Sequence, residues 1–281
     1  MPGTLYIVAT PIGNLEDITL RALRILKEVN LIAAEDTRRT KILLSHYGIE
    51  TPLTSYHDHN ERTKAPALLA RLEKGEKIAL VSDAGTPTLS DPGYRLVRGA
   101  VKGGIDIVPI PGASAVTAVL SASGLPGDRF VFEGFLSAKK RERRERLQRL
   151  REETRTLVFY EAPHRLKEFL HDLVEILGDR EVVLAREVTK VYEEFIRGRL
   201  SVVSAEISHR ELRGEITVVV GGVEQDRHQD RHRDKDVLSA EIQRLKEKGL
   251  RVKEIAEVLG EKFSCPKREI YRLALEKEEK R

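Results

Sequence analysis

The sequence of 281 residues contains one cysteine, one methionine and no tryptophan. A single thiol, Cys265, excludes an internal disulfide and a zinc site built from several cysteines. No apolar run is long enough to cross a bilayer, and no basic-then-apolar segment resembles a secretion signal. We therefore expect a cytoplasmic protein with no membrane partner. The low content of cysteine, methionine and tryptophan, together with 33% charged residues, favours a heat-adapted source.

Familiar ligand-binding patterns are also missing. No Gly-x-Gly-x-x-Gly follows a strand-like run, and no Walker-type lysine loop occurs. His57 and His59, with Glu61 nearby, imitate a set of metal ligands. Alternating positions in a polar loop are more often surface residues, so we expect no metal. The net charge of +4 and pI near 9.0 fit a polyanionic partner, but many unrelated proteins share such values.

Four strand-like apolar runs, by contrast, end in loops rich in glycine, proline and acidic residues. The most informative run, Lys77–Val81, leads into Ser82-Asp-Ala-Gly-Thr-Pro-Thr-Leu-Ser-Asp-Pro-Gly93. The other three lie in the segments 4–14, 31–38 and 105–115. Because the carboxyl ends of parallel strands meet at one edge of an open sheet, the four loops predict one ligand crevice.

Alternating strand and helix patterns predict a mostly parallel sheet in the first half of the chain. The expected helices there are 17–29, 93–102 and 113–123. The pattern breaks at 121–127, where we place a domain boundary. Beyond it we expect the strands 130–133, 156–160, 181–185, 194–197 and 215–220, and the helices 139–153 and 165–177. This gives an N-terminal α/β domain (1–120) and a second α/β domain (121–224).

The C-terminal part has a different character. Residues 225–236 include no apolar side chain and predict a solvated linker. Three short helical patterns follow within 237–281, at 237–248, 252–259 and 266–279, separated by Gly249 and Gly260. They outline a small helix-turn-helix-like unit whose third helix carries Lys267, Arg268 and Arg272. These side chains suit RNA phosphates, although three amphipathic helices also suit a plain bundle or a dimer contact.

Several segments together resemble a known family. In chain order they are ATPIGN, AEDTR, SDAGTPTLSDPG, IPGASA, FEGFL, FYEAPHR and GEITVVV. They are similar to the tetrapyrrole methylase superfamily and, within it, to the branch that methylates a cytidine ribose 2′-oxygen in 16S ribosomal RNA. Small-molecule members carry Gly-Asp-Pro where this chain has Gly85-Thr86-Pro87, so those substrates are disfavoured.

The resemblance implies a tetrapyrrole-methylase-like (class III methyltransferase) two-domain α/β fold with S-adenosylmethionine in the interdomain cleft. The implied partners are 16S rRNA or the 30S subunit, without DNA, and the implied assembly is a homodimer. Carried over position by position, the implied cofactor-binding residues are Thr10, Pro11, Asp83, Ala84, Gly85, Thr86, Ser114, Ala115, Tyr160, Glu161, Ala185, Ile216 and Thr217.

The catalytic residues remain open at this point. A ribose hydroxyl needs a general base or a cation that stabilises its alkoxide. Glu35, Asp36 and Arg38 lie at a strand end and suit an acid–base or RNA-orienting role. They equally suit helix capping and a salt bridge. Lys139 and Lys140 suit alkoxide stabilisation.

The segment Lys139–Arg155 holds nine basic and four acidic residues. Its Lys139, Lys140, Arg141, Arg143 and Arg144 are candidates for RNA phosphates, and the alternative is an ordinary solvated helix. Two other functions also stay open. One is a tetrapyrrole or other small-molecule methylase, and the other is a non-catalytic RNA-binding protein on the same fold.

Overall fold

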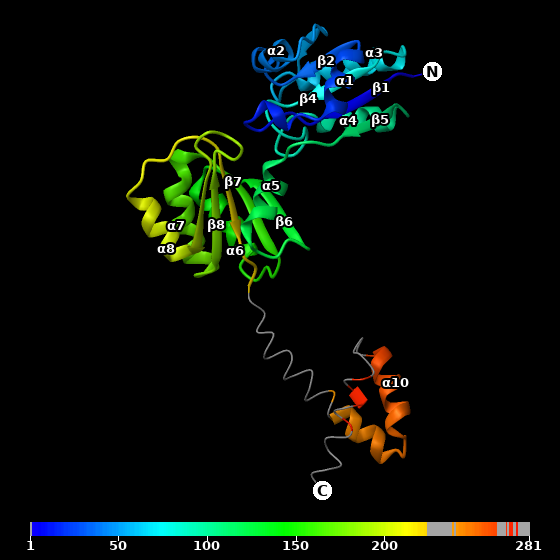
Figure 1. The fold of residues 1–281 in the computed structure, drawn as a ribbon, viewed down its shortest axis with the longest axis vertical. Helices are drawn as coiled ribbons and strands as arrows, with labels where there is room; N and C mark the ends of the chain where they lie inside the picture. The colour runs from blue at the N-terminus through cyan, green and yellow to red at the C-terminus, as the bar shows by residue number, and fades with distance from the viewer. Residues whose placement is uncertain are drawn as a thin grey trace. The chain divides into compact units, whose positions relative to one another are not determined.

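The computed structural model describes residues 2–223, 238, 240–262, 268, 270, 271 and 274. The chain forms two compact units, Met1–Val223 and Glu224–Arg281. The first unit contains two five-stranded sheets. Figure 1 shows the first sheet in blue to green and the second in green to yellow, each with its own covering helices.

The first sheet is parallel throughout, in the order β3-β2-β4-β1-β5. Its strands are β1 (Thr4–Val8), β2 (Leu31–Ala34), β3 (Leu53–Ser55), β4 (Ile78–Val81) and β5 (Asp106–Ile110). β2 and β4 are buried at every position, which explains their continuous apolar sequences. Because all five strands run the same way, the loops after them gather at one edge of the sheet.

Helices cover both faces of this sheet. They are η1 (Leu15–Asp17), α1 (Leu20–Glu28), α2 (Thr37–His46), α3 (Glu61–Glu73) and α4 (Tyr94–Lys102). One core joins Leu26 of α1 and Leu44 of α2 to the sheet. The other core joins α3 and α4 to the opposite face through Leu72 and Leu96. Thr19 begins α1, since its hydroxyl accepts the Ala22 N–H at 3.1 Å.

The second sheet has the order β6-β7-β10-β8-β9, and only the β6–β7 pair is parallel. Its strands are β6 (Phe130–Phe135), β7 (Thr156–Glu161), β8 (Glu181–Arg186), β9 (Glu194–Arg199) and β10 (Ile216–Val220). The helices around it are α5 (Ala115–Ser123), α6 (Lys140–Arg149), η2 (Pro163–Arg165), α7 (Leu166–Leu177) and α8 (Leu200–Ser208). α6, α7 and α8 share one apolar core with the sheet, and α5 shares another.

The predicted strands of the first unit all occur, and their ends lie within two residues of the expected ones. The helix expected at 139–153 ends earlier, at Arg149. α2, β3, α3 and α8 were not expected. The division into domains at residue 120 stays a prediction, and α5 runs across that position.

In the second unit, residues 240–247 are helical and α10 spans Val252–Lys262. The described part of this unit forms a small apolar core of Leu238, Ile242, Ile255, Ala256, Leu259, Ile270 and Ala274. Gly249 adopts φ of 84° and separates the two helices as expected. The expectation for Gly260 is wrong because α10 continues through it.

Other expectations for this unit lie outside the described residues. These are the linker 225–236, the positions Lys267 and Arg272, and most of the third helix. The helix-turn-helix-like arrangement therefore stays a prediction. Among the helices that the structure describes, none has both the length and the apolar character to cross a membrane.

Candidate active site

A cavity of about 390 Å³ opens in the first unit. Small-molecule sites have volumes of roughly 300–1,000 Å³, so the cavity has the size of a ligand site. Loops after the first sheet form one part of its wall, and β6, β7 and β10 with their loops form another. The lining residues are Ile12, Glu35, Arg39, Asp83, Ala84, Gly85, Thr86, Leu89, Ser90, Asp91, Ser114, Ala115, Phe135, Tyr160, Glu161, Ala162, Pro163, Gly214, Glu215, Ile216 and Thr217.

The loops after β1 and β4 are fastened to each other. The Thr10 N–H donates to the Gly85 carbonyl at 2.9 Å, and the Gly85 N–H donates back to Thr10 at 3.0 Å. The Thr10 hydroxyl also donates to the Ser82 carbonyl at 3.1 Å. Gly85 has φ of 80°, a conformation that favours glycine. Thr10 thus supports the loop that faces the cavity.

The loops after β2 and β4 are joined through two carboxylates. The Asp36 N–H donates to the Asp83 carboxylate at 2.9 Å, and the Asp83 N–H donates to the Glu35 carboxylate at 3.2 Å. Arg39 lies 3.4 Å from the Asp83 carboxylate. Burial raises the pKa of Glu35, and the hydrogen bond from Asp83 opposes part of that rise. Both carboxylates therefore fix the loops and also line the cavity.

Asp91 is a further carboxyl group of the cavity wall. Burial and the neighbouring charge of Glu35 raise its pKa to about 7, while a hydrogen bond with Ser82 opposes the rise. The charges of Glu35, Asp83 and Asp58 all act to raise this pKa.

The backbone beside Asp91 is unusual. Thr88 and Ser90 have φ of 75° and 66°, a region that residues other than glycine rarely occupy. Conformations of this kind cost of order 1–3 kcal/mol each and cluster at functional sites. The surrounding structure therefore holds Thr88 and Ser90, just before Asp91, in a backbone conformation that isolated residues avoid.

The second sheet supplies an aromatic and polar wall. The Tyr160 ring lies 5.1 Å from that of Phe132 and 5.4 Å from that of Phe135, measured between centroids. Burial, followed by the charge of Asp91, raises the pKa of Tyr160 to about 12. The Glu161 carboxylate accepts the Ala162 N–H at 2.7 Å and lies 3.1 Å from the Arg165 guanidinium.

Most predicted cofactor-binding residues line this cavity. They are Asp83, Ala84, Gly85, Thr86, Ser114, Ala115, Tyr160, Glu161, Ile216 and Thr217. Thr10, Pro11 and Ala185 are not among the lining residues. Ala185 is fully buried and pairs with Thr217 across β8 and β10. The binding role of the whole set stays a prediction.

The predicted catalytic residues are separated by the fold. Glu35 lines the cavity, whereas Asp36, Arg38, Lys139 and Lys140 do not. Asp36 begins α2 by accepting the Arg38 N–H at 2.9 Å, and it also binds the Arg38 guanidinium at 2.6 Å. These hydrogen bonds lower the pKa of Asp36. This is the capping and salt-bridge alternative that the sequence left open.

Several lining residues were not predicted. They are Ile12, Arg39, Leu89, Ser90, Asp91, Phe135, Ala162, Pro163, Gly214 and Glu215. Ser90 and Asp91 belong to the loop that the sequence already marked as the most informative. Extending the predicted site to the end of that loop would have included both.

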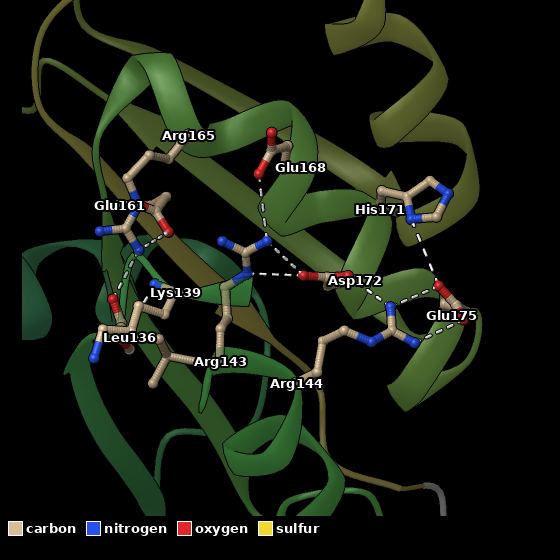
Figure 2. Close-up of polar contacts among 11 residues, drawn as sticks. Leu136, Lys139, Arg143, Arg144, Glu161, Arg165, Glu168, His171, Asp172 and Glu175 are labelled. Atoms are coloured by element: carbon tan, nitrogen blue, oxygen red, sulfur yellow. Dashed lines mark hydrogen bonds and ion pairs between the residues drawn. The ribbon is translucent and has the colours of Figure 1, made fainter. Parts of the chain in front are cut away.

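Some of the cationic side chains of the basic helix α6 are paired inside the protein rather than exposed to solvent. Figure 2 shows Arg143 and Arg144 reaching from α6 to acidic side chains of α7. Both guanidiniums lie 2.7 Å from the Asp172 carboxylate, and Arg144 lies 2.7 Å from Glu175 as well. The Arg143 side chain is only 1% exposed. The expectation that Arg143 contacts RNA phosphates is therefore wrong, because its charge is used inside the protein.

The same helices hold a group of possible metal ligands. In the part of the chain that the structure describes, His171, Asp172 and Glu175 are close enough to share an ion. Two arginines already neutralise Asp172 and Glu175 (Figure 2). This cluster is therefore a salt-bridge network, and it gives no reason to assign a metal.

Comparisons with known proteins agree with the geometry. Residues 4–203 match the model of the Tetrapyrrole (Corrin/Porphyrin) Methylases. A Synechocystis protein named Ribosomal RNA small subunit methyltransferase I is 49% identical over 98% of this chain and 99% of its own. A protein of the same name from Thermotoga maritima is 50% identical over 79% of this chain and 100% of its own.

Solved structures show the same fold at low sequence identity. Uroporphyrin-III C-methyltransferase from Thermus thermophilus, complexed with S-adenyl homocysteine, has a TM-score of 0.57 and 19% identity, covering 78% of this chain and 97% of its own. Diphthine synthase has a TM-score of 0.61 and 16% identity, covering 78% and 90%. The chain therefore belongs to the tetrapyrrole methylase family and, within it, to the proteins named ribosomal RNA small subunit methyltransferase I.

Proposed function

We propose that this chain is an S-adenosylmethionine-dependent methyltransferase acting on the ribose 2′-oxygen of a cytidine in 16S ribosomal RNA. The observation that carries the proposal is its identity of 49% with a small subunit methyltransferase over nearly the whole length of both chains. The cavity at the sheet edge supplies a matching site. A small-molecule substrate is not proposed, because the likeness to uroporphyrin and diphthine enzymes is one of fold.

The cavity fits the proposed cofactor in size and chemistry. Carboxylates of Glu35 and Asp83 suit an ammonium group or ribose hydroxyls, and Ile12, Leu89 and Ile216 suit apolar parts. Gly85 carries no side chain, so the backbone there can approach a ligand closely. Bound S-adenosylmethionine supplies a methyl group on a sulfonium, which is a good leaving group.

The proposed contacts follow from the two walls. Asp83, Ala84, Gly85, Thr86, Ser114 and Ala115 hold the methionine part, and Tyr160, Glu161, Ile216 and Thr217 enclose the adenine. Thr10, Pro11 and Ala185 support these loops and strands from behind. The main task of the protein is to align the attacking oxygen with the methyl group and to exclude water.

A ribose hydroxyl must lose its proton to attack, and Asp91 is the proposed acceptor. Glu35 and Asp83 each accept a backbone N–H that ties two loops together. Asp91 instead has the acidic Glu35, Asp83 and Asp58 as the charges that raise its pKa. A pKa near 7 suits a general base that works at neutral pH. Asp91 thus takes the role considered for Glu35 and Asp36.

The proposed setting is a cytoplasmic homodimer that acts on the 30S subunit or its RNA. Lys139 and Lys140 keep a proposed role in contacting RNA, since the Lys139 side chain is 79% exposed. A pI near 9.0 supports binding to a polyanion.

Methyl transfer tests the proposal directly. Purified protein is incubated with S-adenosylmethionine carrying a labelled methyl group, using 30S subunits, naked 16S RNA or a tetrapyrrole as acceptor. We expect label in a single 2′-O-methylcytidine of the RNA. Label in the tetrapyrrole, or cofactor binding with no transfer to either form of the RNA, would overturn the proposal.

A further inference from the structure

Phe135, at the end of β6, is an exposed aromatic residue on the cavity wall. It lines the cavity, yet 57% of the residue is accessible to solvent. Its ring is tilted by 53° against that of Tyr160, with 5.4 Å between centroids. Leaving a large apolar ring in water forgoes the stabilisation of burial. A ring kept exposed beside a ligand cavity is therefore a candidate for contact with a ligand.

The position of Phe135 depends on a β-bulge. The register between β6 and β7 shifts between Phe132 and Gly134, so that Phe132 pairs with Val158 and Phe135 pairs with Tyr160. Residues three apart lie on opposite faces of a regular strand. Here both Phe132 and Phe135 contact the ring of Tyr160, because the bulge inserts one residue between them.

Gly134 and Glu133 define this bulge. Gly134 has φ of 61°, and a Cβ atom added there would lie 2.5 Å from the Ser90 hydroxyl of the cavity loop. The neighbouring Glu133 carboxylate binds the Arg146 guanidinium of α6 through two hydrogen bonds of 2.7 Å. The Glu133 side chain is only 5% exposed. The Glu133–Arg146 pair thus anchors the bulge, and a side chain at position 134 would displace Ser90.

We propose that Phe135 is a stacking platform for the pyrimidine base of the nucleotide that is methylated. The proposal rests on the proposed function, and it names the contact that orients the RNA. Proteins that recognise single-stranded RNA commonly splay nucleotides out of the stack, and an unstacked base then finds a new partner on an aromatic side chain. An aromatic face provides one for any base. The exposed position of Phe135 at the cavity edge fits an incoming macromolecule, whereas an adenine would be enclosed deeper, against Tyr160 and Ile216.

The test compares four proteins: wild type, Phe135→Ala, Phe135→Leu and Phe135→Tyr. Cofactor affinity is measured by calorimetry, and methyl transfer to 30S subunits or 16S RNA is measured as kcat/KM. We expect Phe135→Ala to lower kcat/KM for RNA about 10- to 100-fold, mainly through KM, with unchanged cofactor affinity. Phe135→Leu keeps apolar area but loses the ring face, so it should resemble alanine. Phe135→Tyr should resemble wild type.

Phe130→Ala is the matched control. Phe130 lies on the same strand and is 38% exposed, but it does not line the cavity. Its loss should leave both measurements unchanged. An equal loss of cofactor affinity and RNA turnover in Phe135→Ala would assign the ring to the cofactor, and an unchanged kcat/KM would assign it no contact. Either result would overturn the stacking proposal and leave the proposed function intact. Wild-type protein that binds the cofactor but methylates no RNA would overturn the proposed function and, with it, the stacking.

Discussion

Two groups of buried or half-buried charges in the first unit differ in how they are neutralised. In the α6–α7 network, Asp172 meets two guanidiniums at 2.7 Å each. At the cavity, Glu35, Asp83 and Asp91 share the wall with a single arginine, Arg39, which lies 3.4 Å from Asp83. Both groups consist of ordinary acidic and basic residues. Their partners in space, rather than their residue types, separate them.

The difference indicates what each group does. Fully paired charges hold two helices together, and removing one member leaves an uncompensated charge in the interior. Carboxyl groups placed close together without enough cations have raised pKa values, as burial and mutual repulsion give Asp91. Such groups are candidates for chemistry. Four changes test this contrast, and they are ordered by the largest effect expected of each.

Asp172→Ala should destabilise the first unit by about 3–5 kcal/mol, because it leaves the buried Arg143 guanidinium without the carboxylate that lies 2.7 Å from it. The free energy of unfolding is measured in urea. Glu175→Ala is the control, since the Glu175 side chain is 52% exposed and its loss should cost at most about 1 kcal/mol. Equal losses in the two variants would mean that the network is no more structural than a surface ion pair.

Asp91→Asn should lower the rate of methyl transfer about 100-fold or more, equivalent to about 2.7 kcal/mol, while the cofactor still binds. Only the carboxylate form can accept a proton, so wild-type activity should rise with pH through about 7. The negative charges of Glu35, Asp83 and Asp58 raise the pKa of Asp91 and so leave this direction unchanged. Tyr160 is neutral in this pH range, because its own pKa is about 12. A variant rate that still rises with a midpoint near pH 7 would exclude Asp91 as the base.

Stability gives an independent view of Asp91. Its folded-state pKa of about 7 lies above the ordinary 3.8, so the folded protein binds this proton more tightly than the unfolded chain. The stability that this tighter proton binding contributes is fully present below the unfolded-state pKa of 3.8, and it is lost as the pH rises through the folded-state pKa of about 7. Asp91→Asn should therefore raise Tm at pH 8 by roughly 2–4 °C, corresponding to about 1 kcal/mol. If Asp91→Asn raises Tm no more at pH 8 than at pH 5, the surroundings do not raise the pKa of the Asp91 carboxyl group.

Asp83→Asn should weaken cofactor binding about tenfold, or about 1.4 kcal/mol, without unfolding the protein. The amide oxygen can still accept the Asp36 N–H, so the variant removes the charge more than the loop contact. Asp36→Asn is the matched control, because Asp36 lies in the same loop pair but does not line the cavity. If the two variants bind the cofactor equally well, Asp83 does not contact it.

Lys139→Gln with Lys140→Gln should have the smallest effect. If both lysines contact phosphates, the slope of log affinity for RNA against log salt should fall by roughly 0.7 to 0.9 for each one. Lys167→Gln serves as a control, since it removes one lysine charge from α7 rather than from the start of α6. A slope equal to wild type in the double variant would leave α6 as a purely structural helix.

Sequence patterns were sufficient for nine of the ten strands and for the edge where the loops gather, and only the short β3 (Leu53–Ser55) was missed. Apolar runs such as Ile78–Val81 are continuous because both faces of the strand are covered, so the local sequence records the burial. α3 was missed because Pro66 interrupts its pattern. The family also followed from the sequence, since its motifs are short and contiguous.

Only the tertiary structure decided what the charged residues do. Arg143 and Asp172 are 29 positions apart. Helical spacing puts Arg143 on the face of Leu147, but the α6 sequence alone does not show that a carboxylate of α7 neutralises its charge there. Likewise, Glu35, Asp36 and Asp91 are equivalent acids in the sequence. Asp36 caps a helix, Glu35 binds a backbone N–H and Asp91 is left among acidic neighbours. The physical reason is that a pKa and an ion pair depend on distances through space and on burial, whereas strand and loop patterns depend on neighbours along the chain.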